Sequence, residues 1–93
     1  MRGSGLRPHL HLFVCANRRE PGSPLGEGCG ARGEEVYAAL KRLVAARGAF
    51  ASTWVTKTYC LGVCPKTGAT VARYPHGDVL ADVTPDDAAA LLE

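Results

Sequence analysis

Hydrophobic and polar positions alternate near the start of the chain. Leu10, Leu12 and Val14 alternate with His11 and Phe13, and a repeat of two residues is typical of a β-strand with one buried face. The pattern predicts a strand over "PHLHLFV" that ends where Cys15 appears. The next segment, "ANRREPGSPLGEG", contains two prolines and three glycines, so it predicts a long loop that ends at Cys29.

A helical repeat follows this loop. In "GEEVYAALKRLVAARG" the apolar side chains fall on one side of a helix, at Val36, Leu40, Leu43 and Val44. Glutamates near the start and basic residues near the end suit the helix dipole, and Gly48 fits a C-terminal stop. We therefore expect one amphipathic helix over residues 33–48.

The second half of the chain predicts three more strands and a second helix. "TWVTKTY" is rich in β-branched and aromatic residues, so we expect a strand that runs directly into Cys60. After Cys64, "GATVARYP" and "DVLADV" flank a short turn and predict a hairpin. Thr84 and Asp87 form the pattern of a capping box, with Pro85 at the first position of the final helix. The predicted order is β-α-β-β-β-α, without repeats.

Length and composition limit the possible classes of protein. A chain of 93 residues with 46% hydrophobic content favours one small domain over residues 1–93, with residues 1–8 as a flexible N-terminal segment. It contains no apolar run of about 18 residues, and its start lacks the features of a secretory signal, so we expect a cytoplasmic protein. The net charge is only +2, and the basic residues are scattered, which argues against binding to nucleic acid or membranes.

The four cysteines are the strongest chemical signal in the sequence. They follow the spacing C-x13-C-x30-C-x3-C, at Cys15, Cys29, Cys60 and Cys64. In a cytoplasmic chain, four thiols favour metal binding or redox chemistry over disulfides. Structural zinc sites usually have two pairs of ligands, each separated by only a few residues. Cys60 and Cys64 fit this pattern, but Cys15 and Cys29 do not. A thioredoxin-like dithiol motif would be C-x2-C beside the first βα unit, whereas the close pair here follows the second predicted strand.

This order and spacing, with "CLGVCPKTGATVARYP" and "VTPDDAAALL", resembles the thioredoxin-like [2Fe-2S] ferredoxins, also called Shethna-type, from about residue 9 to the C-terminus. The resemblance implies an α/β thioredoxin-like fold with a mixed sheet of about four strands flanked by helices. It also implies a homodimer that transfers electrons to redox partner proteins, a reductase or oxidoreductase, and is not an enzyme. The cofactor would be one [2Fe-2S] cluster per chain, and the resemblance assigns all four cysteines as its ligands. A related NADH-dehydrogenase subunit has a shorter gap in its first pair, so the 13 intervening residues favour a free-standing ferredoxin.

The chemistry of the residues agrees with this resemblance. A [2Fe-2S] cluster needs four sulfur ligands, and no histidine stands beside a cysteine as a Rieske centre would require. Gly62, between Cys60 and Cys64, would let the chain turn with a positive φ angle or approach a cluster closely. We expect Trp54 and Tyr59 to serve packing. A small zinc-stabilised interaction domain that uses the same four thiolates remains the alternative.

Overall fold

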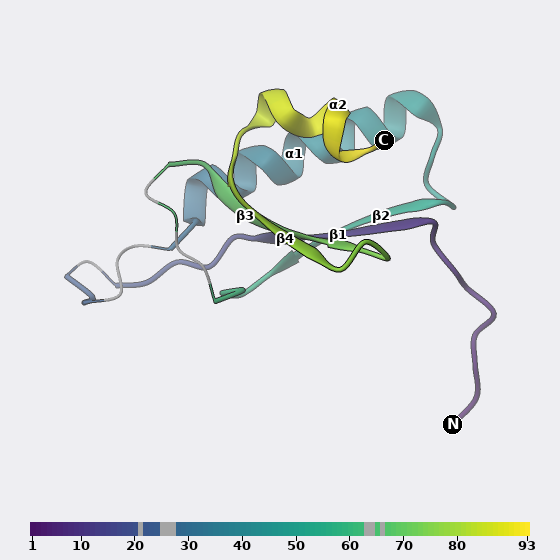
Figure 1. Ribbon diagram of the computed structural model, residues 1–93, viewed down its shortest axis with the longest axis horizontal. Helices are drawn as coiled ribbons and strands as arrows, with labels where there is room; N and C mark the ends of the chain where they lie inside the picture. The colour runs from purple at the N-terminus through teal and green to yellow at the C-terminus, as the bar shows by residue number, and fades with distance from the viewer. Residues whose placement is uncertain (21, 25–27, 63–64, 66) are drawn as a thin grey trace.

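The computed structural model describes residues 1–20, 22–24, 28–62, 65 and 67–93. Within these residues, four strands form one sheet in the order β2-β1-β3-β4 (Figure 1). The strands are β1 (Leu10–Cys15), β2 (Thr53–Thr58), β3 (Ala69–Tyr74) and β4 (Asp78–Val83). β1 pairs in parallel with β2 and antiparallel with β3, which also pairs antiparallel with β4. The mixed sheet and the order of its strands along the chain confirm the α/β prediction.

Helix α1 (Gly30–Arg47) connects the parallel strands β1 and β2 and packs on one face of the sheet (Figure 1). The left-handed φ of 62° at Gly48 confirms the predicted C-terminal stop. The start of α1 differs from the prediction, which placed glutamates in the first turn. Cys29 is the N-cap, and the first turn contains no acidic residue. Glu34 therefore lies beyond the turn in which the helix dipole acts most strongly.

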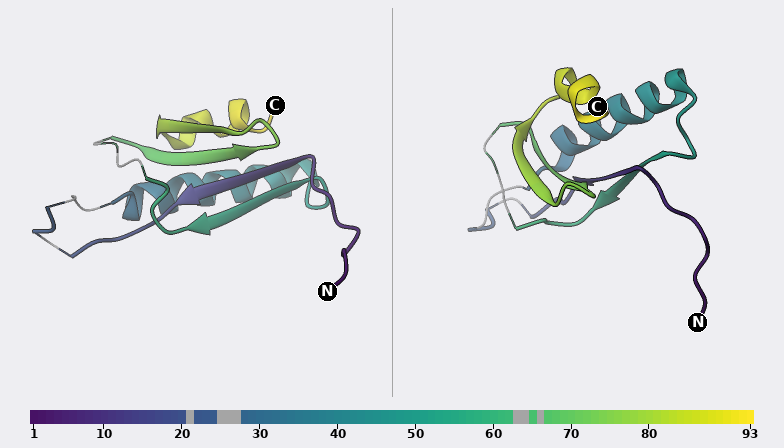
Figure 2. Two further views of the ribbon diagram at one scale, coloured as in Figure 1. Left: turned by 60° about the horizontal axis from the view of Figure 1, so that its bottom comes forward. Right: turned by 45° about the vertical axis from the view of Figure 1, so that its right-hand side comes forward.

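The chain ends in a short helical segment on the same side of the sheet as α1 (Figure 2). A 3-10 turn (Pro85–Asp87) leads into α2 (Ala88–Leu91). The predicted capping box is present, since the backbone N–H of Thr84 donates to Oδ2 of Asp87 at 2.8 Å. Residues 1–8 have no regular secondary structure and lead away from the sheet (Figure 1). No helix in the described part of the chain combines the length and the apolar character needed to cross a membrane.

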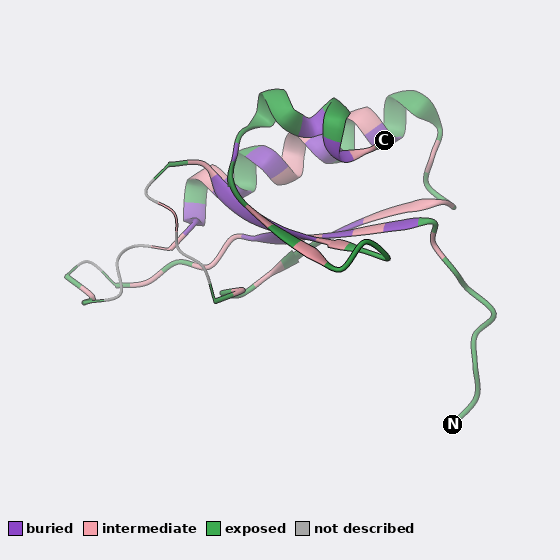
Figure 3. Cartoon of the chain, viewed as in Figure 1, coloured by how far each residue is buried: buried purple, intermediate pink, exposed green. Residues whose placement is uncertain are grey.

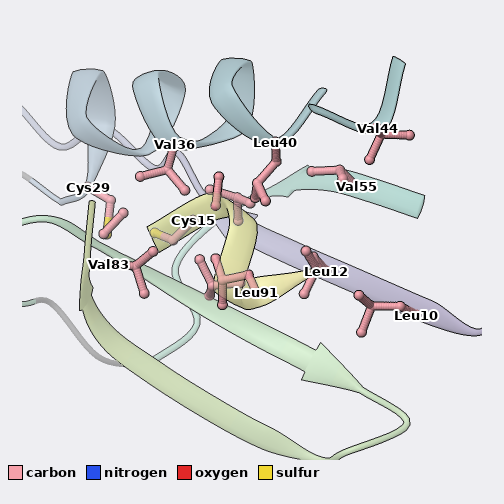
Figure 4. Close-up of a cluster of buried hydrophobic side chains, with 14 residues drawn as sticks. Leu10, Leu12, Cys15, Cys29, Val36, Leu40, Val44, Val55, Val83 and Leu91 are labelled. Carbon is pink, nitrogen blue, oxygen red and sulfur yellow. The ribbon is translucent and has the colours of Figure 1, made fainter. Parts of the chain in front are cut away.

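The buried core lies between the sheet and the two helices (Figures 3 and 4). Its largest fully buried side chains include Leu12 and Val14 from β1, Val36 and Leu40 from α1, and Val71 from β3. These residues have the two-residue and helical spacings expected from the sequence. Leu43, which shared the predicted helix face, is only partly buried against this cluster.

The opposite face of the sheet carries aromatic side chains. His11 and Phe13 alternate with buried residues of β1, and their rings stack with centroids 4.0 Å apart. Trp54 meets His11 edge-on at 5.4 Å, and Tyr74 meets Phe13 at 5.9 Å. Trp54 thus packs as expected, but the expectation for Tyr59 is wrong, because this side chain is 85% exposed just beyond β2.

Candidate metal centre

The sheet topology brings the cysteine-bearing segments to one end of the molecule. Cys15 is the last residue of β1 and pairs with Thr58, the last residue of the parallel strand β2. Cys60 follows Thr58 by two residues, so Cys15 and Cys60 lie at the same end of the two parallel strands. The N–H of Ala16 donates to the carbonyl of Thr58 at 3.0 Å, so the segments that follow β1 and β2 stay paired at the ends of these strands.

Cys29 reaches this end from the start of α1. Cys15 and Cys29 are 0% and 1% exposed in the same buried cluster, and Cys15 is close enough to contribute to the raised pKa of Cys29. Figure 4 draws both residues at the end of the buried cluster nearest the start of α1. Cys64 lies outside the described residues, in the connection between β2 and β3.

Gly33 lets α1 approach the end of β1 closely enough for these two cysteines to meet. A Cβ atom at Gly33 would overlap the carbonyl oxygen of Cys15, which lies against the helix. Glycine is therefore required here by a close approach of two backbones. The sequence contains no local signal for this role, since a glycine near a helix start has many uses.

Burial raises the pKa of the Cys29 thiol above its ordinary value. Hydrogen bonds from the backbone and the hydroxyl of Thr70 lower the pKa, and the hydrogen bond and charge of Cys15 raise it. Thr70 is a buried polar residue, 0% exposed, at the start of β3. Without a bound metal, the neutral thiol of Cys29 is thus favoured over the thiolate.

Cys60 is exposed, and donors on two sides reach its sulfur. The backbone N–H of Gly62 and the guanidinium of Arg19 each donate to its Sγ at 3.3 Å. Gly62 has a φ of 90°, so of the two roles that the sequence left open for it, a positive φ is the one observed. The turn after Cys60 therefore aims a backbone dipole at the sulfur, as ligand loops of iron–sulfur sites do.

Arg32, in the first turns of α1, contacts the loops beside two of the cysteines. Its Nε donates to the carbonyl of Gly68 at 2.8 Å. A terminal nitrogen donates to the carbonyls of Gly28 at 3.2 Å and Pro65 at 3.1 Å. Sequence reasoning did not identify Arg32, because nothing local distinguishes it from the other arginines.

The structure brings together part of the predicted ligand set. Cys15 and Cys29 are adjacent, and Cys60 lies at the same end of the sheet. Among the residues that the structure describes, no three Cys, His, Asp or Glu side chains gather into a metal-binding group.

Known proteins share this architecture. The thioredoxin-like [2Fe-2S] ferredoxin from Aquifex aeolicus superposes with a TM-score of 0.79 at 31% identity, over 94% of this chain and 79% of that one. A variant of that ferredoxin with one cysteine replaced by serine gives a TM-score of 0.78 at 31% identity, over 90% and 83%. A curated relative, a 2Fe-2S ferredoxin of Aquifex aeolicus (strain VF5), is 35% identical over 85 residues, or 89% of this chain and 75% of the relative. The chain belongs to the thioredoxin-like [2Fe-2S] ferredoxins.

Membership of this family confirms the resemblance seen in the sequence and the thioredoxin-like fold that it implied. No family model matches the chain. The assignment therefore rests on the individual relatives together with the observed fold.

Proposed function

We propose that this ferredoxin is a one-electron carrier that holds one [2Fe-2S] cluster on Cys15, Cys29, Cys60 and Cys64. The observation that carries the proposal is the buried contact between Cys15 and Cys29, at the end of the sheet where Cys60 also lies. When bound by four thiolates, such a cluster takes up and releases a single electron.

The described donors fit this group. Two adjacent sulfurs from different elements, Cys15 and Cys29, could hold a cluster from inside the protein, where burial keeps water away. Cys60 offers a sulfur on the outside whose negative charge is stabilised by Gly62 and Arg19. We propose that electrons pass to redox partners, a reductase or oxidoreductase, on the side of the exposed Cys60.

The family relationship favours this role over the alternative of a zinc-stabilised interaction domain that uses the same thiolates. We propose electron transfer as the whole activity of the chain, with any catalysis performed by its partners. Four thiolates without a histidine ligand should give a reduction potential below the range of Rieske centres.

The decisive experiment is metal and sulfide analysis of protein purified without oxygen, together with its visible spectrum. We expect about two irons and two sulfides per chain and a visible ferric-thiolate absorbance. Cys15→Ala, Cys29→Ala, Cys60→Ala and Cys64→Ala should each severely lower the iron content, because one iron then lacks a ligand. One zinc per chain and no absorbance, even after anaerobic reconstitution with iron and sulfide, would overturn the proposal.

We also propose a homodimer formed through the uncovered face of the sheet. This face carries the aromatic side chains and extends to Val79 on the edge strand β4. Val79 lies on the same face as Phe13, because Val79 pairs with Ala72 and Ala72 pairs with Phe13. We call the following residues the aromatic face: His11, Phe13, Trp54, Tyr74 and Val79. None of them is a carboxylate, lysine or arginine, so two copies of this face could meet without repulsion between like charges.

We further propose that the protein is cytoplasmic, because a chain with four cysteines is compatible with a reducing compartment when they serve as metal ligands. Residues 1–93 are proposed to form one domain, with residues 1–8 as a flexible segment. The support for one domain is a single buried cluster that draws on all four strands and both helices.

A further inference from the structure

Arg32 links the start of α1 to a segment that is far away in sequence, the connection between β2 and β3. Its half-buried guanidinium donates to the carbonyl of Gly28 in the loop before α1, and to those of Pro65 and Gly68 in the connection between β2 and β3. The acceptors Pro65 and Gly68 are 33 and 36 residues from Arg32 in sequence. One side chain thus satisfies three loop carbonyls that otherwise need water or other donors.

Two of these carbonyls belong to residues next to proposed cluster ligands. Gly28 directly precedes Cys29, and Pro65 directly follows Cys64. The contacts therefore fix the peptide units through which the two cysteine loops enter and leave the site. Cys64 itself lies outside the described residues, so the contact to Pro65 is the nearest described constraint on it.

We propose that Arg32 is a positioning residue that holds the loops of Cys29 and Cys64 ready for the cluster. This inference rests on the proposed function of these cysteines as ligands. Loops that are already ordered lose less conformational entropy when they bind, so holding them in advance slows the loss of a bound group. The planar guanidinium is suited to this task because its donors point in fixed directions, whereas lysine offers a single mobile ammonium group.

Three variants separate this role from a simple effect of charge. Arg32→Gln removes both the charge and the fork of donors, and Arg32→Lys removes only the fork. Arg42→Gln is the matched control, since Arg42 is an exposed arginine on the same helix. The measurements are the rate at which each reconstituted protein loses its visible absorbance to an iron chelator, and its reduction potential.

We expect Arg32→Gln to lose the cluster at least about tenfold faster than wild type, a factor that corresponds to roughly one charged hydrogen bond. Arg32→Lys should lose the cluster at a rate between those of wild type and Arg32→Gln, yet keep a reduction potential near that of wild type. Arg42→Gln should lose the cluster as slowly as wild type. Equal rates for Arg32→Gln and Arg42→Gln, or full rescue of the rate by Arg32→Lys, would overturn the proposal.

Amide hydrogen exchange of the metal-free protein supplies a measurement that needs no cluster. In Arg32→Gln, exchange should speed up over residues 28–30 and 67–70, while β1 and the second half of α1 stay as protected as in wild type. Faster exchange throughout the chain, with a matching fall in melting temperature, would mean a general structural role and would contradict positioning. If wild-type protein bound neither iron nor sulfide, the proposed function would fail, and exchange would still report whether Arg32 holds these loops.

Discussion

The guanidinium of Arg19 lies 3.3 Å from Sγ of Cys60 and donates a hydrogen bond to it. A positive charge beside a ligand sulfur stabilises the more negative, reduced state of the site. Arg19→Gln should therefore make the reduction potential more negative by tens of millivolts, since about 59 mV corresponds to a tenfold change for one electron. The measurement is a potentiometric titration followed by visible absorbance.

The Arg19 contact is exposed, so added salt should reduce the difference between wild type and Arg19→Gln. Arg19→Lys keeps the charge and should retain most of the wild-type potential. Arg42→Gln, which removes a charge from the outside of α1, serves as the control. A potential for Arg19→Gln equal to that of Arg42→Gln would show that the contact with Cys60 has no effect on the site.

Gly33→Ala should destabilise the metal-free protein, although alanine normally favours helix by about 1 kcal/mol over glycine. The added Cβ would overlap the carbonyl of Cys15, and the adjoining backbone must shift to accommodate it. We expect the free energy of unfolding in urea to fall by about 1–3 kcal/mol, as for other overpacked sites. Gly3→Ala is the control, because nothing lies within 4 Å of a Cβ at Gly3. A rise in stability for Gly33→Ala would contradict the close approach of α1 to β1.

These sites differ in how far the sequence reveals them. The alternation around Leu12 predicts β1 directly, because burial of one face leaves a two-residue period in any sequence. The four cysteines are likewise conspicuous, since thiols are rare and their spacing is distinctive. Elements and ligand candidates could therefore be predicted from local pattern alone.

The contacts that shape the site could not be predicted in this way. Arg32 acquires its role from Pro65 and Gly68, which are more than 30 residues away in sequence and lie beside it only in the folded chain, where β3 pairs with β1. Gly33 is required by its proximity to Cys15, again a product of tertiary structure. The true start of α1 at Gly30 was also missed, because its N-cap is a cysteine instead of a residue that favours this position.

Gly62→Ala and Gly62→Val test why three residues separate Cys60 from Cys64. With a φ of 90° at Gly62, any side chain introduces backbone strain of about 1–3 kcal/mol. The described surroundings leave open space around a Cβ there, so strain and not collision should dominate. We expect both variants to lose the cluster faster in air than wild type, valine more than alanine, with the helical circular dichroism of the metal-free protein unchanged. Cluster lifetimes in both variants that match wild type would make Gly62 an ordinary loop glycine.

Protonation of His11 should weaken the fold in mild acid. Burial lowers the pKa of His11 from its ordinary value of 6.5, and its Nε2 lies 2.8 Å from Oγ1 of Thr56. A lowered pKa means that the stability from neutral His11 is present above pH 6.5 and is lost as the pH falls through the folded-state pKa. Urea unfolding at several values of pH, compared with His11→Gln, measures this contribution. An NMR titration that gave His11 a pKa above 6.5 would contradict the burial effect.

The proposed homodimer can be tested at the aromatic face. Tyr74 and Val79 are 48% and 49% exposed on the side of the sheet opposite α1, so their burial would favour association with a second copy. Val79→Arg would bring two like charges into a symmetric interface, and we expect it to convert the dimer into a monomer at high micromolar concentration. Phe50→Arg is the matched control, because Phe50 is also a large exposed apolar residue, 63% accessible, but follows α1 and lies outside the aromatic face. Sedimentation velocity of the cluster-loaded proteins distinguishes the outcomes. If wild type sediments as a monomer, the proposed homodimer is wrong. If the dimer survives Val79→Arg but not Phe50→Arg, the interface is not the aromatic face.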